Sequence, residues 1–296
     1  MLTQAQCIPC ILNMALRAMR VQNLSNPKQK EIFLKIMNMN ILREDPWQYT
    51  SAEIAEHILK LIRDTIGVYD LFKRERKIQN EMMLKMYDEF EDLLKRSSDP
   101  LKTGLIFAIY GNSIDVMVKE NPHKIVEELI ALVQESDEYI PDRVYKRFIK
   151  IIKDAKTILY LGDNAGEIVM DKLFIKAIRK NIGADIYFVV RSEPSLNDVT
   201  MEDAKKVGMD KMVPVIENGI EGPLPGTLLS RCSDKVKELV NRCDLIISKG
   251  GGNFETISEE KDLPKPVCYL LSSKCNVYSK VFGVSINLPI LSIIER

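Results

Sequence analysis

The spacing of hydrophobic residues along the chain changes once, near residue 156. Before that point apolar residues recur at intervals of three and four, the spacing of amphipathic helices, as in 26–42, 50–67 and 69–96. No segment of this half alternates apolar and polar residues as a half-buried strand does. The pattern predicts an all-helical N-terminal subdomain comprising residues 1–155.

Capping residues mark the ends of several of these predicted helices. Thr50 and Glu53 have the spacing of a capping box, and Gly67 is suited to end the same helix. The stretches 121–136 and 140–155 each begin with a proline near the first turn, where no backbone N–H is needed. These local signals agree with the helical periodicity.

The second half has the hydrophobic pattern of a sheet-containing domain. Short apolar runs, rich in β-branched and aromatic residues, alternate with helical stretches, which is typical of a mostly parallel sheet covered by helices. The predicted strands are 157–163, 184–191, 212–218, 244–250 and 265–271, with 284–290 as a further candidate. We expect residues 156–296 to form a three-layer Rossmann-like α/β domain, doubly wound, against which the helical subdomain packs.

Composition narrows the class of partner. The chain is 46% hydrophobic and 28% charged, as globular proteins are, and its 42 basic residues balance 42 acidic ones. No net charge therefore attracts nucleic acid or an anionic membrane. The most apolar stretch, 103–118, is interrupted by Asn112 and Asp115, and the N-terminus lacks the pattern of a secretion signal. We expect a cytoplasmic protein with neither nucleic-acid nor membrane partners, whose oligomeric state stays open.

Polar residues gather where three of the predicted strands end. The clusters are Gly162–Glu167, then Arg191 with Asn197 and Asp198, and finally Ser248–Glu255. Ligands of an open parallel sheet bind beyond the carboxyl ends of its strands. We therefore expect the three clusters to converge on one crevice.

The first two clusters supply oxygen atoms suited to a hard cation. Asp163 and Asp198 are carboxylates and Asn164 offers an amide oxygen, a set that suits Mg²⁺ or Mn²⁺, with Co²⁺ and Ni²⁺ as further options. A zinc site would favour His or Cys, which neither cluster contains. These three residues are the predicted metal ligands.

The third cluster supplies groups that bind phosphate. Lys249 brings a positive charge, and Gly250, Gly251 and Gly252 offer backbone N–H groups at a predicted helix start. Arg191 adds positive charge from the neighbouring strand end. A metal beside a phosphate cradle is the equipment for phosphoryl hydrolysis.

Each cluster also has a simpler interpretation. Asp or Asn after a strand is a common helix cap, and a run of glycines is often only a turn. The spacing matches neither a G-x-G-x-x-G dinucleotide loop nor a P-loop, which disfavours NAD and nucleoside triphosphates. At this level ligand binding and capping both remain open for Asp163 and Asn164.

Five stretches together resemble the damage-control phosphatase family, long catalogued as a domain of unknown function and also called the acidic-residue methyltransferase-like family. They are "CIPC" from residue 7, "IYGNSIDVMV" from 109, "LGDNAGEIVMD" from 161, "VVRSEPSLNDVTMEDA" from 189 and "SKGGGNFETI" from 248. They occur in the family's order across nearly the whole chain, and the cysteine pair resembles its prokaryotic branch. Val116 and Met117 depart from the glycine or aromatic-glycine that often follows the family's Asp at position 115.

The resemblance implies a metal-dependent phosphomonoester hydrolase acting on small phosphorylated metabolites, including damaged ones. Its metal triad falls on Asp163, Asn164 and Asp198. It further implies phosphate contact by Lys249 and polar shaping of the pocket by Asn253 and Glu255. It also implies that Asn112 and Asp115 reach the crevice from the helical half.

Proton transfer or support of the metal ligands is expected from Glu167, Asp115 or Asp203. The nucleophile is either a water molecule or Asp163 itself. We favour water, because a carboxylate committed to a metal is a poorer nucleophile.

Two other functions stay open. An S-adenosylmethionine-dependent carboxyl methyltransferase, also proposed within the family, fits a Rossmann-like sheet but has no need of three hard-metal ligands. A metal-stabilised scaffold could instead bind a partner through the helical half. The physiological substrate and the identity of the metal are not specified by the sequence.

The six cysteines are expected as thiols or metal ligands. Cys7 and Cys10 form a C-x-x-C pair at a predicted helix start, and Cys275 is a candidate to join them from the far end of the chain. We interpret this pair as structural or accessory rather than catalytic. Ordinary buried residues are expected at the remaining positions, Cys232, Cys243 and Cys268.

Overall fold

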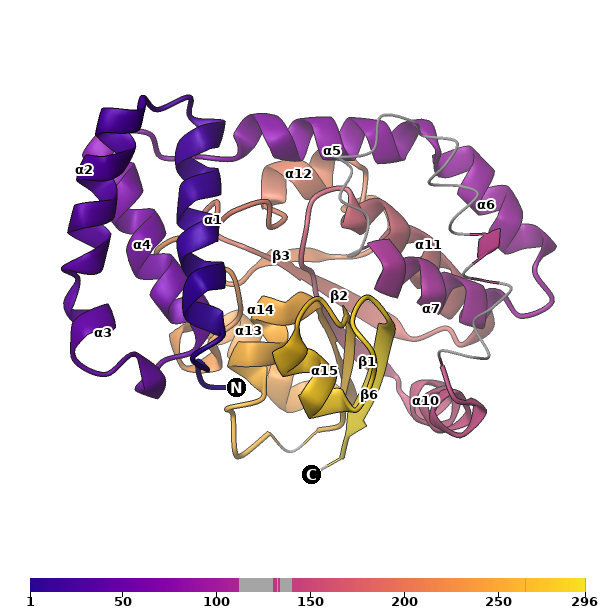
Figure 1. Ribbon diagram of the computed structural model, residues 1–296. Helices are drawn as coiled ribbons and strands as arrows, with labels where there is room; N and C mark the ends of the chain where they lie inside the picture. Colours follow the sequence, from indigo (N-terminus) through magenta and orange to yellow (C-terminus); the bar gives the residue numbers. More distant parts are fainter. Residues whose placement is uncertain (112–129, 132, 134–139, 264, 296) are drawn as a thin grey trace.

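A mostly parallel sheet lies at the centre of the computed structural model, which describes residues 1–111, 130, 131, 133, 140–263 and 265–295 (Figure 1). Its strands are β1 (Thr157–Leu161), β2 (Asp185–Val190), β3 (Val215–Glu217), β4 (Leu245–Lys249), β5 (Val267–Ser272) and β6 (Pro289–Ile294). They lie in the order β3-β2-β1-β4-β5-β6, and only β6 runs antiparallel to its neighbour. The predicted Rossmann-like class is confirmed.

The strand order reverses between β1 and β4, which are hydrogen-bonded neighbours although β2 and β3 separate them in the chain. Such a switch point opens a crevice at the carboxyl ends of the strands. Leu161 pairs with Val189 on one side and with Ser248 on the other, so the three predicted polar clusters start from one edge of the sheet.

Two helical layers cover the sheet because successive strand residues point to opposite faces. Ile158 and Tyr160 of β1 belong to the core on one face, whereas Leu159 and Leu161 belong to the core on the other. The helices of the first face include α10 (Asp142–Asp154), α11 (Glu167–Asn181) and α12 (Met201–Lys206). Those of the second are α13 (Asp234–Arg242), α14 (Gly250–Ile257) and α15 (Asn276–Phe282), with the short turn η2 (Leu229–Arg231) between β3 and α13.

The apolar stretch 103–118 contributes a core helix, α7 (Pro100–Gly111). All of its residues except Pro100 and Lys102 are buried, and it packs against α11, β5 and β6. Gly104 permits the approach to α11, since an added Cβ would lie 3.1 Å from Cα of Phe174. No helix within the described residues is long and apolar enough to cross a membrane.

The helical half divides into two groups by packing. In Figure 1, α1 (Cys7–Val21), α2 (Asn26–Met37), α3 (Asn40–Arg43) and α4 (Ser51–Ile66) form the dark cluster beside the sheet domain, with the short turn η1 (Pro46–Gln48) before α4. Helices α5 (Lys73–Lys85) and α6 (Tyr87–Arg96) lead across to the other side. There α5, α6, α7 and α10 share one core with the sheet. At residue 155, the expected boundary, the secondary structure therefore changes from helices alone to strands alternating with helices. The hydrophobic core, however, continues across this boundary.

Three predicted elements differ in detail. The run 69–96 divides at Met86 into α5 and α6, and the run 26–42 divides into α2 and α3. The last strand begins at Pro289 and so overlaps the predicted 284–290 in only two residues, because its register is set by pairing with β5. Asn112, Asp115 and most of the predicted helix 121–136 lie outside the described residues.

The capping box predicted at the start of α4 is present in the structure. Thr50 Oγ1 accepts a hydrogen bond from the Glu53 N–H (3.2 Å), and the Glu53 carboxylate accepts one from the Thr50 N–H (2.8 Å). We expect Thr50→Ala to lower the free energy of unfolding by about 1 kcal/mol, the usual effect of losing such a cap. Urea denaturation measures this, with the exposed Lys60→Ala on the same helix as the control. Equal stability of the two variants would contradict the assignment.

Candidate active site

Backbone pairing joins the segments that follow β1 and β2. The Ala165 N–H donates to the Asn197 carbonyl (2.8 Å), and the Val199 N–H donates to the Asp163 carbonyl (2.7 Å). These bonds form a short antiparallel bridge between Asn164 and Asp198. All three predicted metal ligands are thereby brought to one place.

The side chain of Asn164 is oriented by two carboxylates. Its Nδ2 donates to Asp163 Oδ2 (2.6 Å) and to Glu167 Oε2 (3.1 Å). The N-cap residue of α11 is Gly166 at φ +77°, so neither Asp163 nor Asn164 occupies the cap position. The Gly166 N–H instead donates to Oδ1 of Asn80 on α5 (2.7 Å). Capping therefore does not account for this pair of polar residues.

Arg191 at the end of β2 holds the second carboxylate. Its Nε donates to Asp198 Oδ2 (2.7 Å), its Nη1 donates to Thr227 Oγ1 (3.0 Å), and its Nη2 lies 3.9 Å from Asp163 Oδ1. The Arg191 side chain is 2% exposed, so its charge is directed at protein carboxylates rather than at solvent.

Burial nevertheless raises the pKa of both aspartates. For Asp163 the pKa is raised well above its usual range by burial and by the neighbouring Glu167 and Asp198, against which Arg191 acts. For Asp198 burial again raises the pKa, and Arg191 offsets part of the shift. A second cation at this point would favour the charged form of both groups.

The Lys249 side chain points away from the crevice. The phosphate contact predicted from the sequence would require it to point into the crevice. Its Nζ is fully buried and donates to Asp171 Oδ1 (2.7 Å) and to Glu167 Oε1. Tyr160 also donates to Asp171 Oδ1 (2.6 Å). Burial alone would lower the pKa of Lys249, but Asp171 and Glu167 raise it above the usual value. Burial raises the pKa of Asp171 to about 6, and Lys249 opposes that shift.

The charges of this buried cluster do not balance. Four carboxylates (Asp163, Glu167, Asp171 and Asp198) accompany two cations, Arg191 and Lys249. If all are ionised, two negative charges remain, which is the charge that one divalent cation neutralises. No three His, Cys, Asp or Glu side chains among the described residues form a metal site by themselves. The set that fits a hard cation is two carboxylates with the Asn164 amide.

The glycine-rich turn after β4 makes room for Asp163. Gly250 has φ +74°, and a Cβ there would lie 1.9 Å from Asp163 Oδ2. Asn253 is fully buried and fastens this turn to β1, since its Nδ2 donates to the carbonyls of Gly162 (2.9 Å) and Lys249 (2.8 Å). Its Oδ1 accepts from Thr227, which links the turn to Arg191.

A cavity of about 890 Å³ opens beside these groups. Of the predicted site residues it is lined by Asp163, Asn164, Asp198, Gly251, Gly252 and Glu255. Lys249, Gly250, Arg191, Asn253, Glu167 and Asp203 do not line it. Asp203 instead completes the capping box of α12 with the N-cap residue Thr200, and it accepts a hydrogen bond from Arg76 Nε (2.8 Å).

Two cations that sequence reasoning missed line the same cavity. They are Arg17 on α1 and Lys274, two residues after the end of β5, and both are exposed. The charge of Lys274 acts on Asp163, whose pKa it lowers against the effect of burial. Lys274 follows the predicted strand 265–271, so the strand-end rule could have identified it. No local sequence feature marks Arg17 as a residue of the cavity.

The sequence profile of the damage-control phosphatase ARMT1-like domain matches residues 3–287. The chain belongs to this family. A damage-control phosphatase of Archaeoglobus fulgidus is 30% identical over 247 residues, 83% of each chain. The damage-control phosphatase PH1575 of Pyrococcus horikoshii is 30% identical over 285 residues, 96% of this chain and 95% of that protein. The crystal structure of that DUF89 family protein superposes with a TM-score of 0.84 at 28% identity, covering 98% of both chains.

The N-terminal cysteine pair of this damage-control phosphatase family member lies at the cavity. Cys7 and Cys10 begin α1, Cys275 precedes α15, and all three line the cavity. Burial raises the pKa of the Cys10 thiol, with Cys275 and Cys7 adding to the effect. All six cysteines are free thiols, and Cys232, Cys243 and Cys268 are buried as predicted.

The two lysines near the site have separable roles that stability measurements can distinguish. Lys249→Met would leave Glu167 and Asp171 buried without their cation, so we expect the free energy of unfolding to fall by about 3–5 kcal/mol. Lys274→Met changes an exposed side chain, and we expect a change within about 0.5 kcal/mol. Urea denaturation of both variants gives the comparison. A similar stability loss for the two would contradict the structural role of Lys249.

Proposed function

We propose that this protein is a divalent-metal-dependent phosphatase that hydrolyses phosphomonoesters of small metabolites. The observation that carries the proposal is the pair of buried carboxylates, Asp163 and Asp198, held together at the sheet's switch point and only partly neutralised by Arg191. Membership of the damage-control phosphatase family and the names of its relatives support the phosphatase class.

Asp163, Asn164 and Asp198 would hold the metal ion. Because Nδ2 of Asn164 donates to Asp163 and Glu167, its Oδ1 is the atom left for a cation. Mg²⁺ and Mn²⁺ suit this oxygen set best, and Co²⁺ and Ni²⁺ accept the same donors. Such an ion, when bound, neutralises charge on the phosphoryl group and orients the attacking water.

The phosphate would be bound by groups that face the cavity. Lys274 and Arg17 supply positive charge there, and Gly251 and Gly252 lie in the first turn of α14, where backbone N–H groups point outward from the helix end. Lys249 has a different part in this scheme. It holds Glu167, which in turn orients the Asn164 amide.

Water is the nucleophile in this proposal. Asp163 accepts a hydrogen bond from Asn164 and faces the charge of Arg191, and both contacts make its carboxylate a poorer nucleophile. We therefore assign Asp163 the role of a metal ligand. A cavity of about 890 Å³ is within the range of small-molecule sites and far larger than a phosphate group, so it suits a phosphorylated metabolite. We place the protein in the cytoplasm, in keeping with its six free thiols.

Metal-stripped protein tests the proposal directly. We expect hydrolysis of p-nitrophenyl phosphate, and of members of a panel of sugar and cofactor phosphates, only after Mg²⁺, Mn²⁺, Co²⁺ or Ni²⁺ is restored. Asp163→Ala and Asp198→Asn should each lower kcat/KM at least about 100-fold, because removing a ligand exceeds the effect of removing a residue that supports one. Steady-state kinetics measure the loss.

Asp210→Asn is the matched control, since Asp210 is an exposed carboxylate that does not line the cavity. Circular dichroism establishes that each variant is folded. An absence of turnover with every metal, in protein that binds S-adenosylmethionine, would overturn the phosphatase and favour a methyltransferase.

A further inference from the structure

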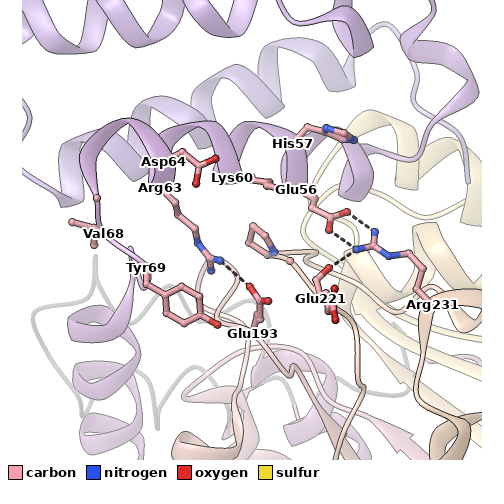
Figure 2. Close-up of a pocket in the computed structure, with 13 residues that line it drawn as sticks. Glu56, His57, Lys60, Arg63, Asp64, Val68, Tyr69, Glu193, Glu221 and Arg231 are labelled. Atoms are coloured by element: carbon pink, nitrogen blue, oxygen red, sulfur yellow. Dashed lines mark hydrogen bonds and ion pairs between the residues drawn. The ribbon is translucent and has the colours of Figure 1, made fainter.

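The loop that carries Asp198 separates two cavities. We call residues 192–198 the β2 loop, because they follow β2. Leu196, Asn197 and Asp198 line the proposed active-site cavity. Glu193 lines a second cavity of about 730 Å³, drawn in Figure 2, whose other wall is α4.

Arg63 on α4 forms hydrogen bonds with the β2 loop from the side of this second cavity. Its Nη1 donates to Glu193 Oε2 (3.2 Å), and its Nη2 donates to the carbonyl oxygen of Pro194. Its guanidinium also lies 4.9 Å from the ring centre of Tyr69, which Figure 2 shows beside it. With the side chain 8% exposed, burial lowers the pKa of Arg63, and Glu193 opposes that shift.

The β2 loop needs such a restraint because its backbone is strained. Leu196 has φ +45°, a left-handed conformation that is unfavourable for a residue with a branched apolar side chain. Neighbouring residues are anchored on both sides of it. Ser195 Oγ donates to the Pro223 carbonyl (2.6 Å), and Asn197 Nδ2 donates to Gln79 Oε1 on α5 (3.4 Å).

Strain at Leu196 makes the position of Asp198 sensitive to these anchors. The Asp198 N–H donates to the Ser195 carbonyl (2.9 Å), so the end of the loop that Arg63 holds is hydrogen-bonded to the residue that would bind metal. Release of Glu193 and Pro194 would let the backbone relax toward φ below zero and would displace the Asp198 carboxylate from Asp163.

We infer that Arg63 is a positioning residue that holds Asp198 in place for the metal and thereby sets the affinity for the metal. The inference rests on the proposed function, because it needs Asp198 to be a metal ligand. Two bonds from one planar guanidinium fix both the direction and the distance of the loop, which a lysine at this position cannot do.

The other ion pair of the second cavity does not contact the β2 loop. Arg231 donates to both carboxylate oxygens of Glu56 (2.7 Å each) and to the Glu221 carbonyl (2.5 Å), as Figure 2 shows. Lys60, one turn before Arg63 on α4, lines the same cavity and has no hydrogen bond or ion pair to any described residue. It is therefore a matched control for loss of a cation from the cavity.

Calorimetric titration of metal-free protein with Mn²⁺ tests the inference. We expect Arg63→Ala to raise the Kd for Mn²⁺ on the order of 10-fold, as loss of a residue that supports a metal ligand does. The Mn²⁺ concentration for half-maximal hydrolysis of p-nitrophenyl phosphate should rise in parallel. The KM for p-nitrophenyl phosphate at saturating Mn²⁺ should stay at the wild-type value, as should every constant of Lys60→Ala.

The outcomes separate the two proposals. Wild-type protein that neither binds Mn²⁺ nor hydrolyses the ester removes the proposed function and this inference with it. Wild-type protein that does both, with Arg63→Ala within twofold of its Kd, overturns the role of Arg63 alone. A lower melting temperature with unchanged Kd would likewise reduce Arg63 to a stabilising contact. If Arg63→Ala does not fold, Arg63→Lys decides, with a rise of about threefold expected from loss of the two-pronged contact.

Discussion

The site depends on one interaction, the backbone pairing between the segment after β1 and the segment after β2. Two carboxylates in a buried crevice repel one another, and side-chain contacts alone would let them separate. The bonds from Ala165 to Asn197 and from Val199 to Asp163 hold the two backbones side by side against this repulsion. Parallel register makes this pairing possible, because β1 and β2 end at the same edge of the sheet.

Buried countercharges then define what the crevice can bind. Arg191 and Lys249 both lie at strand ends, yet both are directed at protein carboxylates, and neither lines the cavity. They neutralise part of the acidic cluster, and two negative charges remain if all four of its carboxylates are ionised. The cations that line the cavity are instead Arg17 and Lys274. One set of cations thus stabilises the buried acidic cluster, and another set faces the cavity.

The helical half is part of the site as well as a cover for the sheet. Asn80 of α5 accepts a hydrogen bond from Gly166, the N-cap residue of α11, and Gln79 accepts one from Asn197. Arg63 of α4 holds the β2 loop, while Leu196 packs on the core formed by α1 and α4. The geometry of both proposed carboxylate ligands therefore depends on helices that are far away in the sequence.

Local patterns determined much of this protein: the change from helices to strands near residue 156, the capping box at Thr50, and the polar clusters at the strand ends. They suffice because hydrophobic periodicity and the strand-end rule act over a few residues and one edge of a sheet. Tertiary structure alone decided the direction of the Lys249 and Arg191 side chains, the start of the last strand at Pro289, and the arrival of Arg17 and Arg63. The physical reason is that a buried charge turns toward a nearby opposite charge, and the partners of Lys249 and Arg63 lie 78 and 130 residues away in the chain. The register of the last strand and the place of Arg17 likewise depend on how separate segments pack.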